Sequence, residues 1–254
     1  FGIIVCALRF FDARSGDYFA RLLAGLPHAS GREVSSLASL EMARAAVELR
    51  DGEGLAVVGF DLAGEEAGYP AAYHREAYQY AHSHFLKKTV HAGEAYGPES
   101  IFQAITECHA NRIGHGTFLF DKSMIKDGSV ERPEQYVEQL AEYIANERIT
   151  VEVCLTSNLQ TIPAIGSVAD HSLSRMLAHS LSVSICTDNR LVSDTSVTRE
   201  LELVAEHLPV TRRQFRNIIV AGFKGSFLRG SYIQKRAYVR KAIDLYERVE
   251  GELL

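Results

Sequence analysis

Short apolar segments alternate along the chain with longer segments in which apolar residues recur every three or four positions. Each short segment is rich in β-branched residues and too brief for a helix, which is typical of a strand buried on both faces. Strands that alternate with amphipathic helices indicate βα units and a parallel sheet. Six strands are predicted, at residues 2–9, 55–62, 88–92, 111–115, 150–156 and 182–188.

The longer segments predict the helices. In residues 39–50, Leu40 and Val47 fall on one helical face, as in a helix that covers a core. Residues 12–36 and 117–131 have a linker-like composition and are predicted to be excursions within one domain. Further helices are predicted at residues 71–86, 98–109, 132–147, 170–180, 195–207, 211–224 and 232–248.

Length and composition agree with an α/β protein of one domain. The chain has 254 residues, of which 46% are apolar and 23% charged, and a formal net charge of −5. A TIM-type barrel takes ~250 residues, so residues 1–254 are expected to form a single domain. The mildly acidic balance argues against nucleic acid as a partner, and no apolar run approaches the ~18 residues of a membrane span.

The four cysteines are far apart and form no Cys-x-x-Cys pair. This spacing indicates neither a zinc ribbon nor a disulfide framework. Most of them stand in strand-like segments, where a cysteine usually serves as a small buried apolar residue. A reducing, cytoplasmic location is therefore expected. They are Cys6, Cys108, Cys154 and Cys186.

Candidate chemistry clusters at the carboxyl ends of the predicted strands, where a parallel barrel assembles its active site. His91 ends one strand, and Glu94 follows three residues later across a glycine. An imidazole can bind a metal ion while such a carboxylate folds back beside it as a general acid. His115 stands between two glycines, which leave its ring open to a bound reactant. Asp188 ends an apolar strand, where a carboxylate needs a metal ion, a cation or several donors, or caps the next helix.

Taken together, these motifs resemble the adenosine deaminase family, whose members are zinc-dependent (β/α)8 barrels of the amidohydrolase superfamily. The resemblance runs from near the first residue to about residue 230 and keeps the order of the family's motifs. It rests on residues 61–65 (DLAGE), 90–94 (VHAGE), 112–117 (RIGHGT), 151–154 (VEVC), 157–158 (SN) and 187–188 (TD).

The resemblance implies one Zn2+ per chain, with His91 and Asp188 among its ligands. Glu94 would protonate the purine ring at N1 while water adds at C6, and His115 would orient the attacking hydroxide and stabilise its charge. Gly64 would contact the purine through its backbone. Zinc makes water nucleophilic near neutral pH, so the implied reaction is hydrolytic loss of ammonia from a purine.

Two features depart from the family pattern. The family's first strand carries a His-x-His pair that binds zinc, and this sequence has no counterpart, so its six βα units are expected to be the third to eighth of an N-terminally incomplete barrel. The pair His82 and His84 lies late in a predicted helix, where side chains two residues apart diverge, and is expected to be solvated or partly packed. His171, on another predicted helix, is expected to be a surface residue or a hydrogen-bonded core residue.

The second departure is Asn189, where adenosine deaminases commonly have an aspartate that contacts N7 of the purine. An asparagine amide donates a hydrogen bond without needing to be protonated, so Asn189 is expected to keep this contact. The following Arg190 could reach an anionic substituent or form a structural ion pair. The substituent at N9 therefore stays open.

The sequence thus predicts a zinc-dependent deaminase of adenosine or a related 6-aminopurine, with a small purine nucleoside or base as its partner. Deamination of adenine or of aminofutalosine is an alternative. A non-catalytic purine-binding barrel with an incomplete metal site is a second. Another amidohydrolase reaction is a third, but no strand end presents the lysine that binuclear members carbamylate.

Overall fold

A computed structural model describes residues 1–252 of the chain. Six parallel strands form one sheet, and their order in space is their order in the sequence. Within the described residues, β1 and β6 each pair with one strand, so the sheet is open at both edges. The strands are β1 (Ile3–Leu8), β2 (Val57–Ala63), β3 (Lys87–Ala92), β4 (Arg112–His115), β5 (Thr150–Val153) and β6 (Ser182–Ile185).

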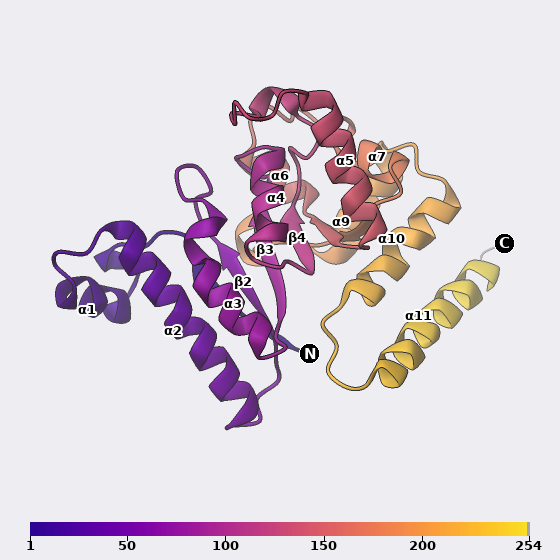
Figure 1. Cartoon of the computed structure of the whole chain (residues 1–254). Coiled ribbons are helices and arrows are strands. Elements are labelled where there is room, and N and C mark those ends of the chain that lie inside the picture. The colour runs from indigo at the N-terminus through magenta and orange to yellow at the C-terminus, as the bar shows by residue number, and fades with distance from the viewer. Residues whose placement is uncertain (253–254) are drawn as a thin grey trace.

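Helices follow each strand and cover the sheet (Figure 1). The α-helices are α1 (Asp17–Gly25), α2 (Gly31–Asp51), α3 (Arg75–Ser83), α4 (Pro98–Thr106), α5 (Pro133–Asn146), α6 (Leu155–Thr161), α7 (Leu173–Ala178), α8 (Arg190–Ser193), α9 (Val197–His207), α10 (Arg212–Gly225) and α11 (Tyr232–Glu252). Short 3-10 helices are η1 (Ala13–Ser15), η2 (Ala71–His74), η3 (Lys122–Met124) and η4 (Val168–Asp170).

The predicted α/β fold of six βα units is confirmed, and so are all six strands. The last two strands are shorter than predicted, since β5 gives way to α6 and β6 stops at Ile185. The segment 12–36, predicted to be an excursion of linker-like composition, is largely helical. It contains α1 and the start of α2, which begins with a capping box in which Ser30 and Glu33 satisfy each other's backbone amides.

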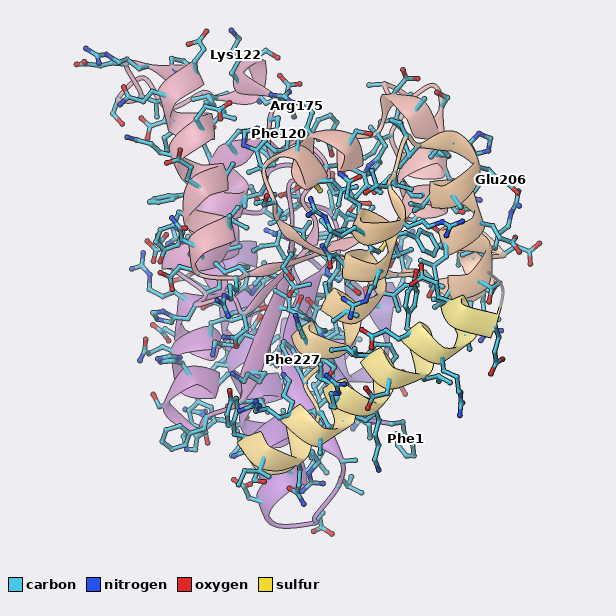
Figure 2. All side chains as sticks on the ribbon, turned by 90° about the vertical axis from the view of Figure 1, so that its right-hand side faces the viewer. Phe1, Phe120, Lys122, Arg175, Glu206 and Phe227 are labelled. Carbon is cyan, nitrogen blue, oxygen red and sulfur yellow. The ribbon has the colours of Figure 1, made fainter. Side chains whose placement is uncertain are left out.

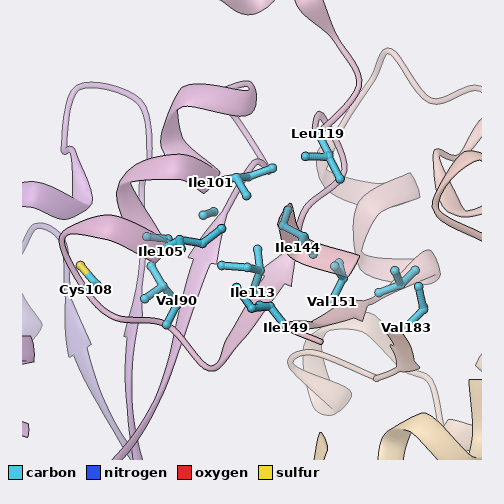
Figure 3. Close-up of a cluster of buried hydrophobic side chains, with 14 of the residues drawn as sticks. Val90, Ile101, Ile105, Cys108, Ile113, Leu119, Ile144, Ile149, Val151 and Val183 are labelled. Carbon is cyan, nitrogen blue, oxygen red and sulfur yellow. The ribbon is translucent and has the colours of Figure 1, made fainter. Parts of the chain in front are cut away.

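The core lies between the sheet and its helices. Val90, Ile113, Val151 and Val183 are paired in register across β3 to β6 and are almost fully buried. Figure 3 shows this row beneath the side chains of the covering helices, among them Ile144 of α5. An apolar row that crosses four strands fixes their register, because a shift by one residue would turn every side chain to the opposite face.

Helix α11, like α1, has no buried residue among those described. It packs against α10 (Figure 1). The segment between α10 and α11 carries Phe227, which is labelled in Figure 2. The centroid of its ring lies 3.7 Å from the guanidinium carbon of Arg112. In residues 1–252, no helix has the length and apolar character needed to cross a membrane.

Candidate active site

The carboxyl ends of β3, β4 and β6 bring three potential metal ligands together. One side-chain donor atom from each of His91, His115 and Asp188 lies within 4.8 Å of the others. His91 belongs to β3, His115 ends β4 and Asp188 follows β6. Residues far apart in the sequence therefore meet at one edge of the sheet, as the pattern of strand ends predicts.

His91 is held by a carboxylate from the neighbouring strand. Its Nδ1 lies 3.2 Å from Oδ1 of Asp61 on β2. Burial lowers the pKa of His91, but the hydrogen bond and charge of Asp61 outweigh it and raise that pKa to about 9. A metal ion that binds Nε2 of His91 therefore displaces the proton from that nitrogen, while Nδ1 keeps donating to Asp61 and fixes the ring orientation. Asp61 is thus suited to support a metal ligand at His91.

His115 is oriented by a chain of hydrogen bonds that begins at a backbone amide. The N–H of Leu173 donates to Nδ1 of His171 (3.0 Å). Burial and the neighbouring His115 lower the pKa of His171 to about 4, so its ring is neutral and Nε2 carries the proton. That Nε2 donates to Oδ1 of Asn158 (3.2 Å), and Nδ2 of Asn158 donates to Nδ1 of His115 (3.0 Å).

This chain decides which nitrogen of His115 carries the proton. Since Nδ1 accepts a hydrogen bond, the proton of the neutral ring lies on Nε2, and burial lowers the pKa of His115. A protonated Nε2 is a donor and not a metal ligand. The network therefore favours His91 and Asp188 for a metal ion and leaves His115 to donate a hydrogen bond.

Glu94 faces that donor. Its Oε2 lies 3.6 Å from Nε2 of His115, and its Oε1 accepts a hydrogen bond of 3.4 Å from the hydroxyl of Thr161. The Glu94 side chain is half-buried, so it faces both the cluster and solvent. A group in this position is placed to exchange a proton with a molecule bound over the cluster.

Asp188 and Asn189 take different positions after β6. Oδ2 of Asp188 accepts a hydrogen bond of 2.8 Å from Ser157, whereas Oδ1 of Asn189 caps α8 through the N–H of Val192 (3.2 Å). The helix cap is therefore Asn189 and not Asp188. The cap uses the oxygen of Asn189, not the amide nitrogen that the predicted purine contact requires.

Gly64 follows β2 at the same edge and is exposed, with a backbone φ of +97°. This conformation favours glycine over residues with a Cβ. The nearby Arg9 is buried and donates from Nη2 to the carbonyl of His91 (2.6 Å). The pair His82 and His84 lies at the end of α3, exposed and half-buried, and takes no part in the cluster.

Sequence reasoning did not single out several buried polar residues at this edge. Glu66 accepts several hydrogen bonds from the loop that carries Glu94, and Glu200 accepts them from Thr156 of α6 and from Thr195. His171 was expected to be a surface or hydrogen-bonded core residue and proves to be the latter. The only signal in the sequence is a position close after a predicted strand or on a helix beside one, which is too common to identify them.

The donor chemistry fits zinc. Imidazole nitrogen and carboxylate oxygen are the usual ligands of a catalytic zinc ion, which also keeps a position for water. His91 and Asp188 supply one of each, and Asp61 gives His91 the carboxylate support typical of metal-binding histidines.

A parallel sheet of βα units with such donors at its carboxyl edge is the arrangement of barrel hydrolases that use a metal ion. A model of the family described as adenosine deaminase matches residues 27–244. The chain therefore belongs to the adenosine deaminase family.

Three known proteins illustrate this similarity. Adenosine deaminase 1 of Streptomyces coelicolor is 40% identical over 191 residues, which are 75% of this chain and 46% of that protein. The chain spans about half the length of the curated relatives it matches. An amidohydrolase of Burkholderia ambifaria with bound Zn has the same fold, with a TM-score of 0.73 at 18% identity, over 99% of this chain and 58% of that one. The N6-methyl-AMP deaminase of Arabidopsis thaliana gives a TM-score of 0.67 at 25% identity, over 96% and 58%.

Proposed function

We propose that this protein is a zinc-dependent hydrolase that removes ammonia from C6 of adenosine or a closely related 6-aminopurine. The observation that carries the proposal is the cluster of His91, His115 and Asp188 with Glu94 beside it. Membership of the adenosine deaminase family supports the same reaction. The proposal treats residues 1–254 as one domain with one zinc ion per chain.

Each residue has a role that follows from its position. A zinc ion held by His91 and Asp188 would supply a Lewis acid that lowers the pKa of water towards 7. Glu94 donates a proton to N1 of the purine, which makes C6 electrophilic. His115 donates from Nε2 to the attacking oxygen and stabilises its negative charge. Gly64 and the amide of Asn189 contact the purine ring.

Adenosine is the first substrate to test, because relatives that are 40% and 38% identical to this chain are named adenosine deaminases. Two solved neighbours are named for other 6-aminopurines, an adenine deaminase of Arthrobacter aurescens and the plant N6-methyl-AMP deaminase. Adenine, adenosine and N6-methyl-AMP differ at N9 and at N6, so comparing them identifies which substituents the site accepts.

The test is formation of the 6-oxopurine from each of these purines by the zinc-loaded protein, with release of ammonia from adenine and adenosine and of methylamine from N6-methyl-AMP. Glu94→Gln removes the proton donor and should lower kcat roughly 100-fold to 10,000-fold, while circular dichroism shows an unchanged fold. Glu99→Gln is the matched control, since Glu99 lies on α4 and accepts hydrogen bonds from the amides of Lys126 and Asp127. Its kcat should stay at the wild-type value.

Metal binding is tested separately. Calorimetric titration should give one zinc ion per chain, and Asp188→Asn should weaken binding at least roughly 10-fold because an amide is a poor zinc ligand. If zinc binds but no purine is deaminated, the non-catalytic alternative replaces this proposal. If Glu94→Gln retains wild-type turnover, the assigned proton donor is wrong.

A further inference from the structure

One buried carboxylate organises the segment that carries Glu94. Glu66 lies in the loop after β2 and is 6% exposed. Its Oε2 accepts hydrogen bonds from the backbone amides of Glu94 (3.0 Å), Ala95 (2.6 Å) and Tyr96 (2.9 Å). Its Oε1 accepts from the amide of Gly93 (2.8 Å) and from the hydroxyl of Ser100.

Five donors on one carboxylate stabilise its negative charge without a direct ion pair, since none of the ion pairs among residues 1–252 includes Glu66. Consecutive backbone N–H groups that converge on one anion form a concave site for it. The segment 93–96 also leads into the N-terminus of α4, which favours a negative charge.

Gly93 makes this wrapping possible. Its φ is +74°, and a Cβ at this position would lie 2.6 Å from Cδ1 of Ile101. The backbone therefore turns sharply between His91 on β3 and Glu94. After this turn, the four amides of residues 93–96 face Glu66, while the Glu94 side chain approaches His115.

We propose that Glu66 is a positioning residue for Glu94, in that its carboxylate fixes the backbone from which the Glu94 side chain reaches the reacting purine. The effect on catalysis rests on the proposed function, whereas the fixing of the backbone by Glu66 does not. A displacement of about 1 Å in a catalytic group can cost roughly 100-fold in rate, so an anchor of this kind has a measurable effect.

Glutamine cannot replace Glu66, although it has nearly the same shape. Both carboxylate oxygens accept hydrogen bonds from at least two donors. In either orientation of a glutamine amide, its NH2 group, which only donates, would face other donors. We therefore expect Glu66→Gln to release the segment 93–96.

The first experiment measures hydrogen exchange of the amides of residues 93–96 by NMR, in the wild type, Glu66→Gln and Glu99→Gln. We expect exchange at these four amides to become at least tenfold faster in Glu66→Gln only, with the amides of Val90 and Ile113 unchanged. Unchanged exchange at the four amides would overturn the proposal. Should Glu66→Gln not fold, Glu66→Asp keeps the charge with a shorter reach, and we expect it to speed their exchange by a smaller factor.

The second experiment is a double-mutant cycle with Glu94→Gln. If Glu66 acts through Glu94, Glu66→Gln lowers kcat 10-fold to 100-fold with KM changed less than about twofold, and the double variant is no slower than Glu94→Gln alone. Losses that multiply in the double variant would show an independent role and overturn the proposal. A wild-type protein that deaminates no purine would refute the proposed function, and the exchange measurement would still decide whether Glu66 holds the segment.

Discussion

The carboxyl and amino ends of the strands differ in their buried acidic residues. At the carboxyl edge, Asp61, Glu66 and Glu200 are at most 8% exposed, and each accepts hydrogen bonds from two or more groups. At the amino edge, a cavity of about 940 Å³ is lined by side chains that include the exposed Lys87 and Lys224.

This difference shows where the fold accommodates buried charges. A buried carboxylate is tolerated only when hydrogen bonds or opposite charges replace its water. The carboxyl ends of the strands meet that condition repeatedly, although the cavity of about 940 Å³ lies at their amino ends. Dense networks around buried charges, and not cavity size, therefore locate the candidate site in this protein. Replacements at each edge test that distinction.

The largest effect on stability is expected from Glu200→Gln at the carboxyl edge. Glu200 of α9 is fully buried and accepts hydrogen bonds from the amide of Thr156 (3.1 Å), the hydroxyl of Thr195 (2.7 Å) and the hydroxyl of Thr156. An amide in its place carries no charge and cannot accept all three hydrogen bonds, so the free energy of unfolding should fall by about 3 kcal/mol. Urea denaturation measures this change.

Glu202→Gln is the matched control on the same helix. Glu202 forms an ion pair of 3.5 Å with Arg199, and both side chains are more than half exposed. Its replacement should change the free energy of unfolding by less than about 0.5 kcal/mol. Similar losses for the two variants would remove the distinction between buried and exposed carboxylates on which the comparison depends.

Asn158→Asp should reverse the hydrogen bond to His115. A carboxylate only accepts hydrogen bonds, so Nδ1 of His115 becomes the protonated nitrogen and Nε2 loses its proton. Loss of this donor should lower kcat roughly 100-fold. Long-range 1H–15N NMR reads the protonated nitrogen directly, in the absence of substrate.

Asn217→Asp provides the control for that change, because Asn217 lines the cavity at the amino edge. It should leave the protonated nitrogen of His115 unchanged. An Asn158→Asp protein that keeps the proton on Nε2 would mean that the chain from Leu173 through His171 does not control His115.

A smaller, pH-dependent effect is expected from His74, a fully buried residue of η2 whose Nδ1 lies 2.5 Å from the hydroxyl of Ser39. Burial, followed by the charge of Arg9, lowers the pKa of His74 from 6.5 to about 4. The unfolded chain therefore binds the proton first as the pH falls below 6.5, and the folded state loses stability down to about pH 4. The loss at pH 5 is about 2 kcal/mol.

The measurement compares the free energy of unfolding between pH 7 and pH 5 in the wild type and in His74→Gln. The variant should lose about 2 kcal/mol less over this interval, because glutamine does not titrate. Since His171 has a pKa lowered in the same direction, only the difference between the two proteins reports on His74. Parallel pH dependences would show that His74 is not buried as a neutral ring.

The strands and the gathering of the candidate residues at one end of them were predictable because their signals are local. A short β-branched segment that ends in His91 or Asp188 combines a buried strand with a polar end, and parallel strands bring such ends together. The start of α2 was missed since Gly31, Arg32 and Ser35 interrupt the apolar period. Its helix depends on the capping box and on Val34 and Ala38, which pack against Phe11 in a second small core.

The hydrogen-bonded supports of the site could not be predicted in the same way. Asn158 and His171 are separated by 13 residues, and Glu66 lies 27 residues before Gly93. Their partners are chosen by the packing of loops against one another, which no periodicity encodes. The candidate site residues are thus easier to find from the sequence than the residues that hold them in place.

The smallest effect is expected at the amino edge, from Lys87→Ala. Burial, followed by the charges of Lys87 and Arg112, lowers the pKa of Lys235, which donates to the carbonyl of Ser226 (2.7 Å). Removing the charge of Lys87 relieves this repulsion, so the free energy of unfolding should rise by at most about 0.5 kcal/mol. The gain should vanish in ~1 M salt, where the Debye length is ~3 Å. A loss above about 1 kcal/mol would mean that the amino edge also depends on its charges, and the contrast between the two edges would fail.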